Sequence, residues 1–74
     1  MYTKDNYKNE MNEILQSNGY DPVFIAKQTY LIYVNHIKEI DKKLRNDLLD
    51  ISIMENGPEF EMTEEEFKKF LHKM

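Results

Sequence analysis

The fold is decided by residues 21–51, which read DPVFIAKQTYLIYVNHIKEIDKKLRNDLLDI. Asp21 is suited to cap a helix N-terminus, and Pro22 is favoured at the first helical position. From there residues recur in alternating steps of three and four, the spacing of one helical face, with a single polar member. The series is Val23, Ala26, Tyr30, Tyr33, Ile37, Ile40, Leu44, Asp47 and Ile51. We therefore predict one long helix over residues 22–50, roughly 40 Å at ~1.5 Å per residue.

The two halves of this predicted helix differ in character. Residues 23–34 are apolar on nearly every side, whereas residues 35–50 are amphipathic. The side chains that widen the stripe in the first half are Phe24, Ile25, Leu31, Ile32 and Val34. That half must therefore be buried on several sides. The β-branched and aromatic run at residues 29–34 leaves a buried strand open as an alternative, but residues 23–56 contain no Gly or Pro, which favours the helix.

A shorter amphipathic helix is predicted over residues 4–18. Thr3 or Asp5 is suited to cap its start, and Gly19 is suited to end it in a left-handed conformation. Its apolar face consists of Tyr7, Met11, Ile14 and Leu15.

A third helix is predicted over residues 63–73, where the sequence TEEE matches a capping box. In that motif the Thr63 hydroxyl accepts from the amide three residues on, and the Glu66 carboxylate reaches back. Met62 and Phe67 occupy the positions of the accompanying hydrophobic staple. The predicted buried face is Phe67, Phe70, Leu71 and Met74.

Between the second and third helices, residues 51–62 are predicted to form either a short β-hairpin or an extended loop. Asn56 and Gly57 suit a type I′ turn, and Phe60 and Met62 alternate with glutamates, as on a half-exposed strand. Pro58 removes one backbone donor, and an isolated two-stranded ribbon is marginal unless it packs on helices. Both forms stay open at this point.

The chain of 74 residues is expected to be a single small helical domain, residues 1–74, of the all-α class. A core of this size rarely supplies more than ~3 to 5 kcal/mol, so support from a partner or a second copy is expected. The absence of cysteine excludes disulfides, thiolate metal sites and cysteine nucleophiles. No signal-like or membrane-spanning apolar segment is present in the sequence, so a cytoplasmic location without a membrane partner is expected. The bias towards Lys, Asn and Ile indicates an AT-rich genome, such as that of a low-GC bacterium or its phage.

No pattern of side chains points to catalysis, and we predict no enzyme activity, no metal and no cofactor. The serines lack the glycine context of a nucleophile elbow. His36 and Glu39, three residues apart on a predicted helix, supply two ligands where a metal needs three or four. An EF-hand aligned on Gly57 would place Ser52 and Met54 where acidic ligands belong.

The acidity is concentrated in residues 50–66, which contain seven acids and no base, although the net charge of the chain is only −4. The plain explanation is that Glu64 to Glu66 favour a helix start and the other acids are solvated. The functional explanation is a docking surface for a protein partner with a basic surface, steered by charge and held by apolar side chains. The candidate partner-binding residues are Glu55, Glu59, Phe60, Glu61 and Met62.

The stripe of the long helix is a candidate self-association surface. The two shorter helices cannot cover the long one on every apolar side, so a homodimer is expected, with Asp47 as the polar interruption of the seam. The candidate self-association residues are Tyr33, Ile37, Ile40, Leu44 and Leu48.

These observations predict a small acidic protein–protein interaction module that acts as a regulator, inhibitor or adaptor by binding a protein partner. The alternative is a small dimeric DNA-binding transcriptional regulator whose Lys42, Lys43 and Arg45 contact phosphates. Asp41 and Asp47 flank that cluster, and the chain has no basic face, so we do not expect nucleic acid to be the main partner.

Overall fold

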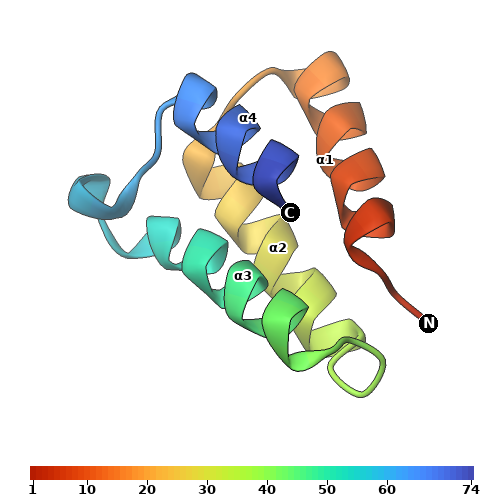
Figure 1. Ribbon diagram of the computed structural model, residues 1–74. Helices are drawn as coiled ribbons and strands as arrows, with labels where there is room; N and C mark the ends of the chain where they lie inside the picture. Colours follow the sequence, from red (N-terminus) through yellow and green to blue (C-terminus); the bar gives the residue numbers. More distant parts are fainter.

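The computed structural model describes all 74 residues, and every regular element in it is helical (Figure 1). The elements in chain order are α1 (Lys4–Asn18), α2 (Pro22–Asn35), α3 (Lys42–Ser52), the 3-10 turns η1 (Ile53–Asn56) and η2 (Pro58–Phe60), and α4 (Glu64–Lys73). The prediction of an all-α fold is confirmed. None of the helices combines the length and the apolar composition that crossing a bilayer requires.

Helix α1 has the predicted bounds, and both of its ends follow from local sequence. Thr3 caps the start, because its hydroxyl accepts from the Asn6 amide at 3.3 Å and its own amide donates to the Asn6 side chain at 2.9 Å. Gly19 ends the helix with a φ of 74° while its N–H donates to the Leu15 carbonyl at 3.1 Å. That left-handed conformation is strained for residues other than glycine.

The starts of α2 and α4 are also where the sequence predicts them. The Asp21 carboxylate accepts from the Phe24 amide at 3.2 Å, and Pro22 occupies the first turn. At α4 the Thr63 hydroxyl accepts from the Glu66 amide at 3.1 Å, and the Thr63 amide donates to the Glu66 carboxylate at 2.9 Å. Each cap satisfies backbone donors that the helix itself leaves unpaired.

The prediction of one helix over residues 22–50 is wrong in its middle. The chain turns back between Asn35, where α2 ends, and Lys42, where α3 begins. Asp41 has an extended backbone with φ −77° and ψ 172°, and its carboxylate accepts from the Leu44 amide at 2.8 Å. An aspartate competes in this way with the helical hydrogen bonds of the backbone, so it favours a helix start over a helix interior.

The regular spacing of apolar residues hides this break, because apolar residues lie on both sides of α2 and the series continues without interruption into the core face of α3. Ile40 lies in the turn, Leu44 and Leu48 lie on α3, and all three are buried. Burial of one such side chain contributes about 1.5–3 kcal/mol, so folding α3 back onto α2 is favoured over continuing the helix.

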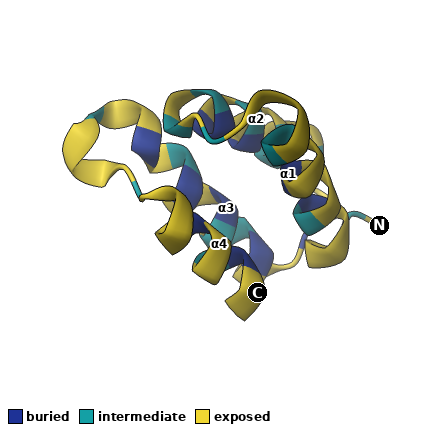
Figure 2. Ribbon diagram, turned by 90° about the horizontal axis from the view of Figure 1, so that it is seen from above, coloured by how far each residue is buried: buried dark blue, intermediate teal, exposed yellow.

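All four helices and η1 contribute to one core (Figure 2). Its buried apolar residues are Tyr7, Met11, Ile25, Ala26, Ile40, Leu44, Leu48, Ile51, Met54, Phe67, Leu71 and Met74. Phe70, predicted to be buried with the last three, is only half-buried. Thr29 is the single buried polar residue, and its hydroxyl lies 2.8 Å from the Tyr7 hydroxyl. This hydrogen bond satisfies both buried groups and ties α1 to α2.

Residues 51–62 form neither the hairpin nor the extended loop that the sequence left open. Instead the end of α3 continues into η1 and η2. Ile51 and Met54 are both fully buried, and helical backbone places residues three apart on one side, whereas a strand would place them on opposite sides. Gly57 separates the two turns with a φ of 156°, which side chains rarely permit, and Pro58 begins η2.

Leu48 and Leu49 are adjacent and identical in chemistry, so together they test the assigned core. Leu48 is fully buried and Leu49 is 39% exposed. We expect Leu48→Ala to lower the free energy of unfolding by about 2–5 kcal/mol, because it removes transfer energy and leaves a cavity. Leu49→Ala should cost less than about 1 kcal/mol. Urea unfolding followed by far-UV circular dichroism measures both, and equal losses would contradict this packing.

Candidate functional site

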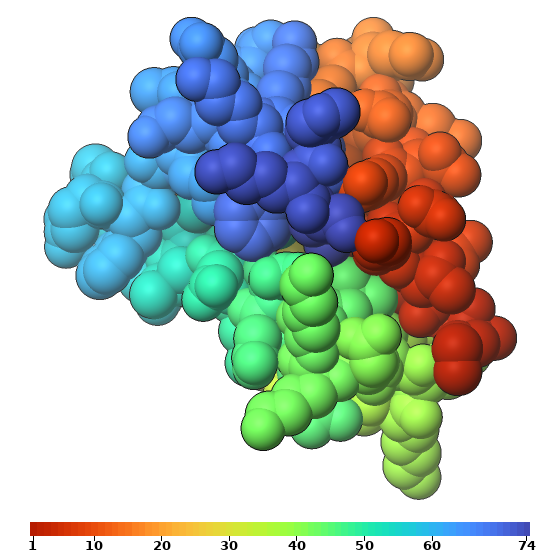
Figure 3. All heavy atoms as spheres, viewed as in Figure 1, coloured from red at the N-terminus to blue at the C-terminus, as the bar shows by residue number.

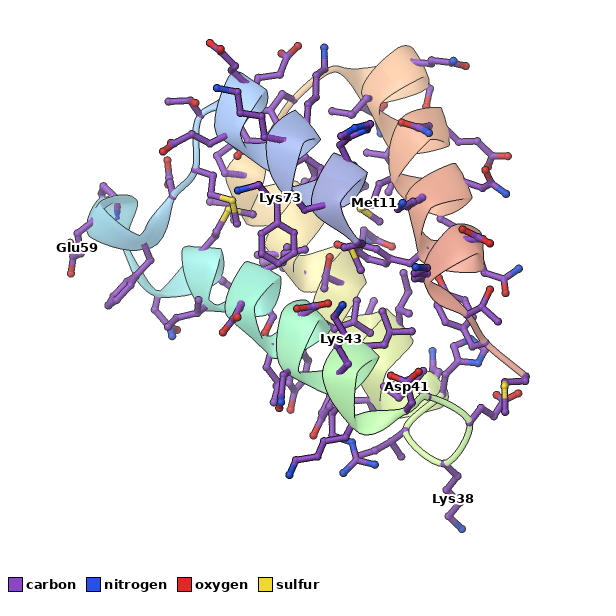
Figure 4. The ribbon with its side chains drawn as sticks, viewed as in Figure 1. Met11, Lys38, Asp41, Lys43, Glu59 and Lys73 are labelled. Atoms are coloured by element: carbon purple, nitrogen blue, oxygen red, sulfur yellow. The ribbon has the colours of Figure 1, made fainter.

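Residues 53–62, here called the acidic loop, project from the body of the protein between α3 and α4 (Figures 1 and 3). Glu55, Glu59 and Glu61 are all exposed on this loop, and Glu59 points away from the body (Figure 4). None of the three takes part in an ion pair. Their charges therefore form an uncompensated negative surface.

Phe60 is the apolar centre of the acidic loop. It stands in η2 between two of the exposed glutamates and is itself 43% exposed. Ile53, at the start of the loop, is also exposed and was not among the predicted binding residues. Its position follows once the helical phase is continued past α3, because Ile51 and Met54 on the core side leave Ile53 on the outer side.

The structure separates Met62 from Phe60, although the sequence grouped the two as possible anchors. Met62 is half-buried against the core. Its N–H lies 3.4 Å from the Sδ of Met54, and its carbonyl accepts a hydrogen bond from the Tyr20 hydroxyl. Met62 therefore fastens the end of the acidic loop to the body, and Phe60 is the side chain that faces solvent.

Tyr20, in the link between α1 and α2, holds the acidic loop from the body side. Its ring packs on the ring of Phe67 with centroids 5.7 Å apart, and its hydroxyl donates to the Met62 carbonyl. Burial, with a further contribution from carboxylates led by Glu61, raises the pKa of Tyr20 to about 12. The hydroxyl therefore keeps its proton at neutral pH and remains a donor.

The first-turn glutamates of α4 are engaged within their own helix. Glu64 pairs with Lys68 at 2.8 Å, and Glu65 pairs with Lys69 at 3.5 Å. Glu66 closes the capping box described above. These three acids serve the helix start, so the unpaired charge of residues 50–66 lies on the acidic loop and on Asp50, which is exposed near the end of α3.

The predicted self-association residues do not lie on one face. Ile40, Leu44 and Leu48 are in the core of the single chain, Tyr33 is half-buried on α2, and Ile37 is exposed in the turn that follows α2. The predicted seam required a continuous helix, and the turn before α3 removes it. A homodimer therefore requires a different surface.

The basic cluster at the start of α3 is only partly available to a ligand. Lys42 and Lys43 are exposed, but Arg45 is half-buried and its Nε is shielded from solvent without a hydrogen-bond partner. One turn further on, burial raises the pKa of Asp47, and the nearby charge of Lys43 opposes that shift. Lysine and aspartate charges are thus interleaved on this part of α3.

His36 and Glu39 fasten the N-terminal residues to the turn between α2 and α3. The His36 Nδ1 lies 2.7 Å from the Glu39 carboxylate, and the Tyr2 ring stacks on the imidazole with centroids 4.3 Å apart. The ammonium group of Met1 lies 3.7 Å from Glu39. The hydrogen bond from His36 is the main cause that lowers the pKa of Glu39. No group of three His, Asp or Glu side chains lies close enough to hold a metal ion.

No protein-family model matches the chain, and no curated protein or solved structure is significantly similar to it. Its function must therefore be inferred from its own side chains.

The Tyr20 hydroxyl gives a direct test of how the acidic loop is held. We expect Tyr20→Phe to cost about 0.5–1.5 kcal/mol of stability, since it removes one hydrogen bond, and to speed amide exchange in residues 53–62. Tyr30→Phe is the matched control, because the Tyr30 ring is 50% exposed. Hydrogen–deuterium exchange read by mass spectrometry distinguishes the two. Equal exchange in all three proteins would show that the hydroxyl does not hold the loop.

The raised pKa of Tyr20 also predicts a loss of stability in alkali. An unfolded tyrosine ionises near pH ~10, so above that value the unfolded state gives up its proton while the folded state keeps it up to about 12. The contribution of Tyr20 is fully present below pH ~10 and is lost as the pH rises through the folded value. Between these two pH values the free energy of unfolding should therefore fall less steeply for Tyr20→Phe than for wild type. The midpoints of urea unfolding measure this difference. If the urea midpoints of both proteins fell equally with pH, the raised pKa of Tyr20 would be contradicted.

Proposed function

We propose that this chain is a small protein-interaction module and that the acidic loop recognises a protein partner with a basic surface. The observation that carries the proposal is the position of Phe60. Its aromatic ring is 43% exposed on a loop whose base is buried, and it is flanked by Glu59 and Glu61, which have no ion-pair partners.

Each part of the acidic loop supplies a different element of binding. Glu55, Glu59 and Glu61 attract a basic partner over distances of about a Debye length and raise the association rate. Phe60 supplies apolar area that is buried only in the complex, and aromatic side chains of this kind dominate interface energies. Ile53 adds a second exposed apolar contact at the other end of the loop.

The loop is suited to this role because its base is held in place. Met54 is fully buried, and the Tyr20 hydroxyl bonds the Met62 carbonyl, so both ends of the loop are attached to the core. A loop already held in its binding conformation loses less entropy on association. The same proposal covers action as a regulator, inhibitor or adaptor in the cytoplasm, because each of these roles consists of occupying a surface of another protein.

The proposal is tested by comparing two binding-loop variants with a control of equal charge change. We expect Glu59→Lys with Glu61→Lys to slow association several-fold and to weaken its dependence on salt. Phe60→Ala should mainly speed dissociation, by about tenfold or more. Asp5→Lys with Glu13→Lys reverses two exposed acids on α1 and should leave both rates near wild type.

The partner is first identified as a protein that both the wild-type bait and the α1 control capture from an extract of the source cells, and that resin without bait does not capture. Surface plasmon resonance at two salt concentrations then gives the rates for the purified pair. Circular dichroism confirms that each variant is folded. Identical kinetics for wild type and both loop variants would refute the role of the acidic loop.

A further inference from the structure

The side of α2 that faces away from the core carries an apolar stripe that nothing in the single chain covers. Its members recur at steps of three and four, and they include some of the most exposed large apolar residues of the protein, with Tyr30 at 50% and Leu31 at 52%. We call this stripe the outer face of α2. It consists of Val23, Lys27, Tyr30, Leu31 and Val34.

This outer face differs from the isolated exposed apolar residues that most proteins carry. A helix on the surface of a single-chain protein normally presents charged and polar residues to water. Helix α2 contains one charged residue, Lys27, and only Ile25, Ala26 and Thr29 are fully enclosed by the chain. The sequence predicts that residues 23–34 are buried on several sides. In a single copy of the chain, only the side of α2 that carries Ile25, Ala26 and Thr29 is buried.

The charges at the two ends of the outer face indicate what covers it. Asp21 precedes the stripe, and Lys38 lies in the turn that follows α2. Neither takes part in an ion pair, whereas Glu39 beside Lys38 is paired with His36 and with the Met1 ammonium. Lys38 extends away from the body (Figure 4). If two copies pair antiparallel, Asp21 of each lies near Lys38 of the other, and the helix dipoles oppose. A parallel pairing would instead bring like charges together.

The middle of the stripe is consistent with the same arrangement. The rings of Tyr30 and Tyr33 pack against each other with centroids 6.1 Å apart. In an antiparallel pair centred on Tyr30, Lys27 of one copy lies over this aromatic pair of the other. A lysine ammonium near aromatic rings is stabilised by cation–π attraction, which accounts for a charge within an apolar stripe.

We propose that the outer face of α2 is a self-association surface on which two copies of this chain pair antiparallel about a two-fold axis at Tyr30. A two-helix seam of this size lies at the small end of specific interfaces, so the dimer dissociates on dilution into the micromolar range. The proposal does not depend on the acidic loop. Its consequence for the proposed function is that each dimer carries two acidic loops.

The mass in solution tests whether the outer face of α2 joins two copies. Light scattering over a concentration series should show wild type approaching twice the 9.0 kDa chain mass. Leu31→Glu and Val34→Glu should remain monomeric at tenfold higher concentration, because each would bury a charge in the seam. Both positions are exposed in the single chain, so the circular dichroism spectrum should not change. Phe60→Glu is the control, since it alters a comparably exposed apolar residue outside α2 and should dimerise as wild type does.

The orientation is tested by disulfide formation, because the chain has no cysteine of its own. Tyr30→Cys lies on the proposed axis, so its two copies should cross-link rapidly under mild oxidation. The two copies of Val23→Cys would lie about 21 Å apart along the helix axis at ~1.5 Å per residue, and should cross-link no faster than Phe60→Cys, which reports random collision.

Three results would overturn the proposal. A wild type that stays monomeric would leave a different protein as the occupant of this face. A dimer that Leu31→Glu and Phe60→Glu weaken equally would place the interface elsewhere. Cross-linking of Val23→Cys as fast as that of Tyr30→Cys would show a parallel pairing.

Discussion

The packing of α3 against α2 is the contact on which the rest of the structure depends. It requires the chain to turn back after Asn35, and the cap at Asp41 starts the new helix. Once α3 lies on α2, Ile51 and Met54 enter the core at its far end, and this determines where the acidic loop leaves the body. The same packing uses only one side of α2. The acidic loop and the outer face of α2 therefore both follow from one helix–helix contact.

The remaining helices close the core through contacts that also satisfy its polar groups. The Tyr7 hydroxyl on α1 is hydrogen-bonded to the Thr29 hydroxyl on α2. The Phe67 ring on α4 packs on the ring of Tyr20, which lies in the link between α1 and α2. In a chain of 74 residues the margin of stability is small, so each such contact is a large part of it. Exposed apolar groups such as Phe60 and Leu31 add less to that margin, because about half of their surface stays in contact with water.

The two candidate surfaces suit different kinds of partner. The acidic loop is short and negatively charged with one aromatic centre, which favours fast and salt-sensitive binding to a basic protein. The outer face of α2 is longer and almost uncharged, with opposite charges at its ends, which favours a second copy in the antiparallel sense. A dimer that carries two acidic loops would bind a partner with two basic sites more tightly than one copy can, because the second contact is then intramolecular.

Sequence alone determined the helical class and the helix starts at Asp21 and Thr63, because a cap is satisfied by an amide within the next turn. For the first helix it left Thr3 and Asp5 as alternative caps, and the structure has Thr3. It also located the uncompensated acids. Only the tertiary structure decided that α2 and α3 are separate, since no Gly or Pro marks the turn and the apolar spacing continues through it. It likewise decided that Phe60 is free while Met62 is held. That difference arises from the Tyr20 hydroxyl, and residues so distant in sequence are brought together only by the burial of a shared core.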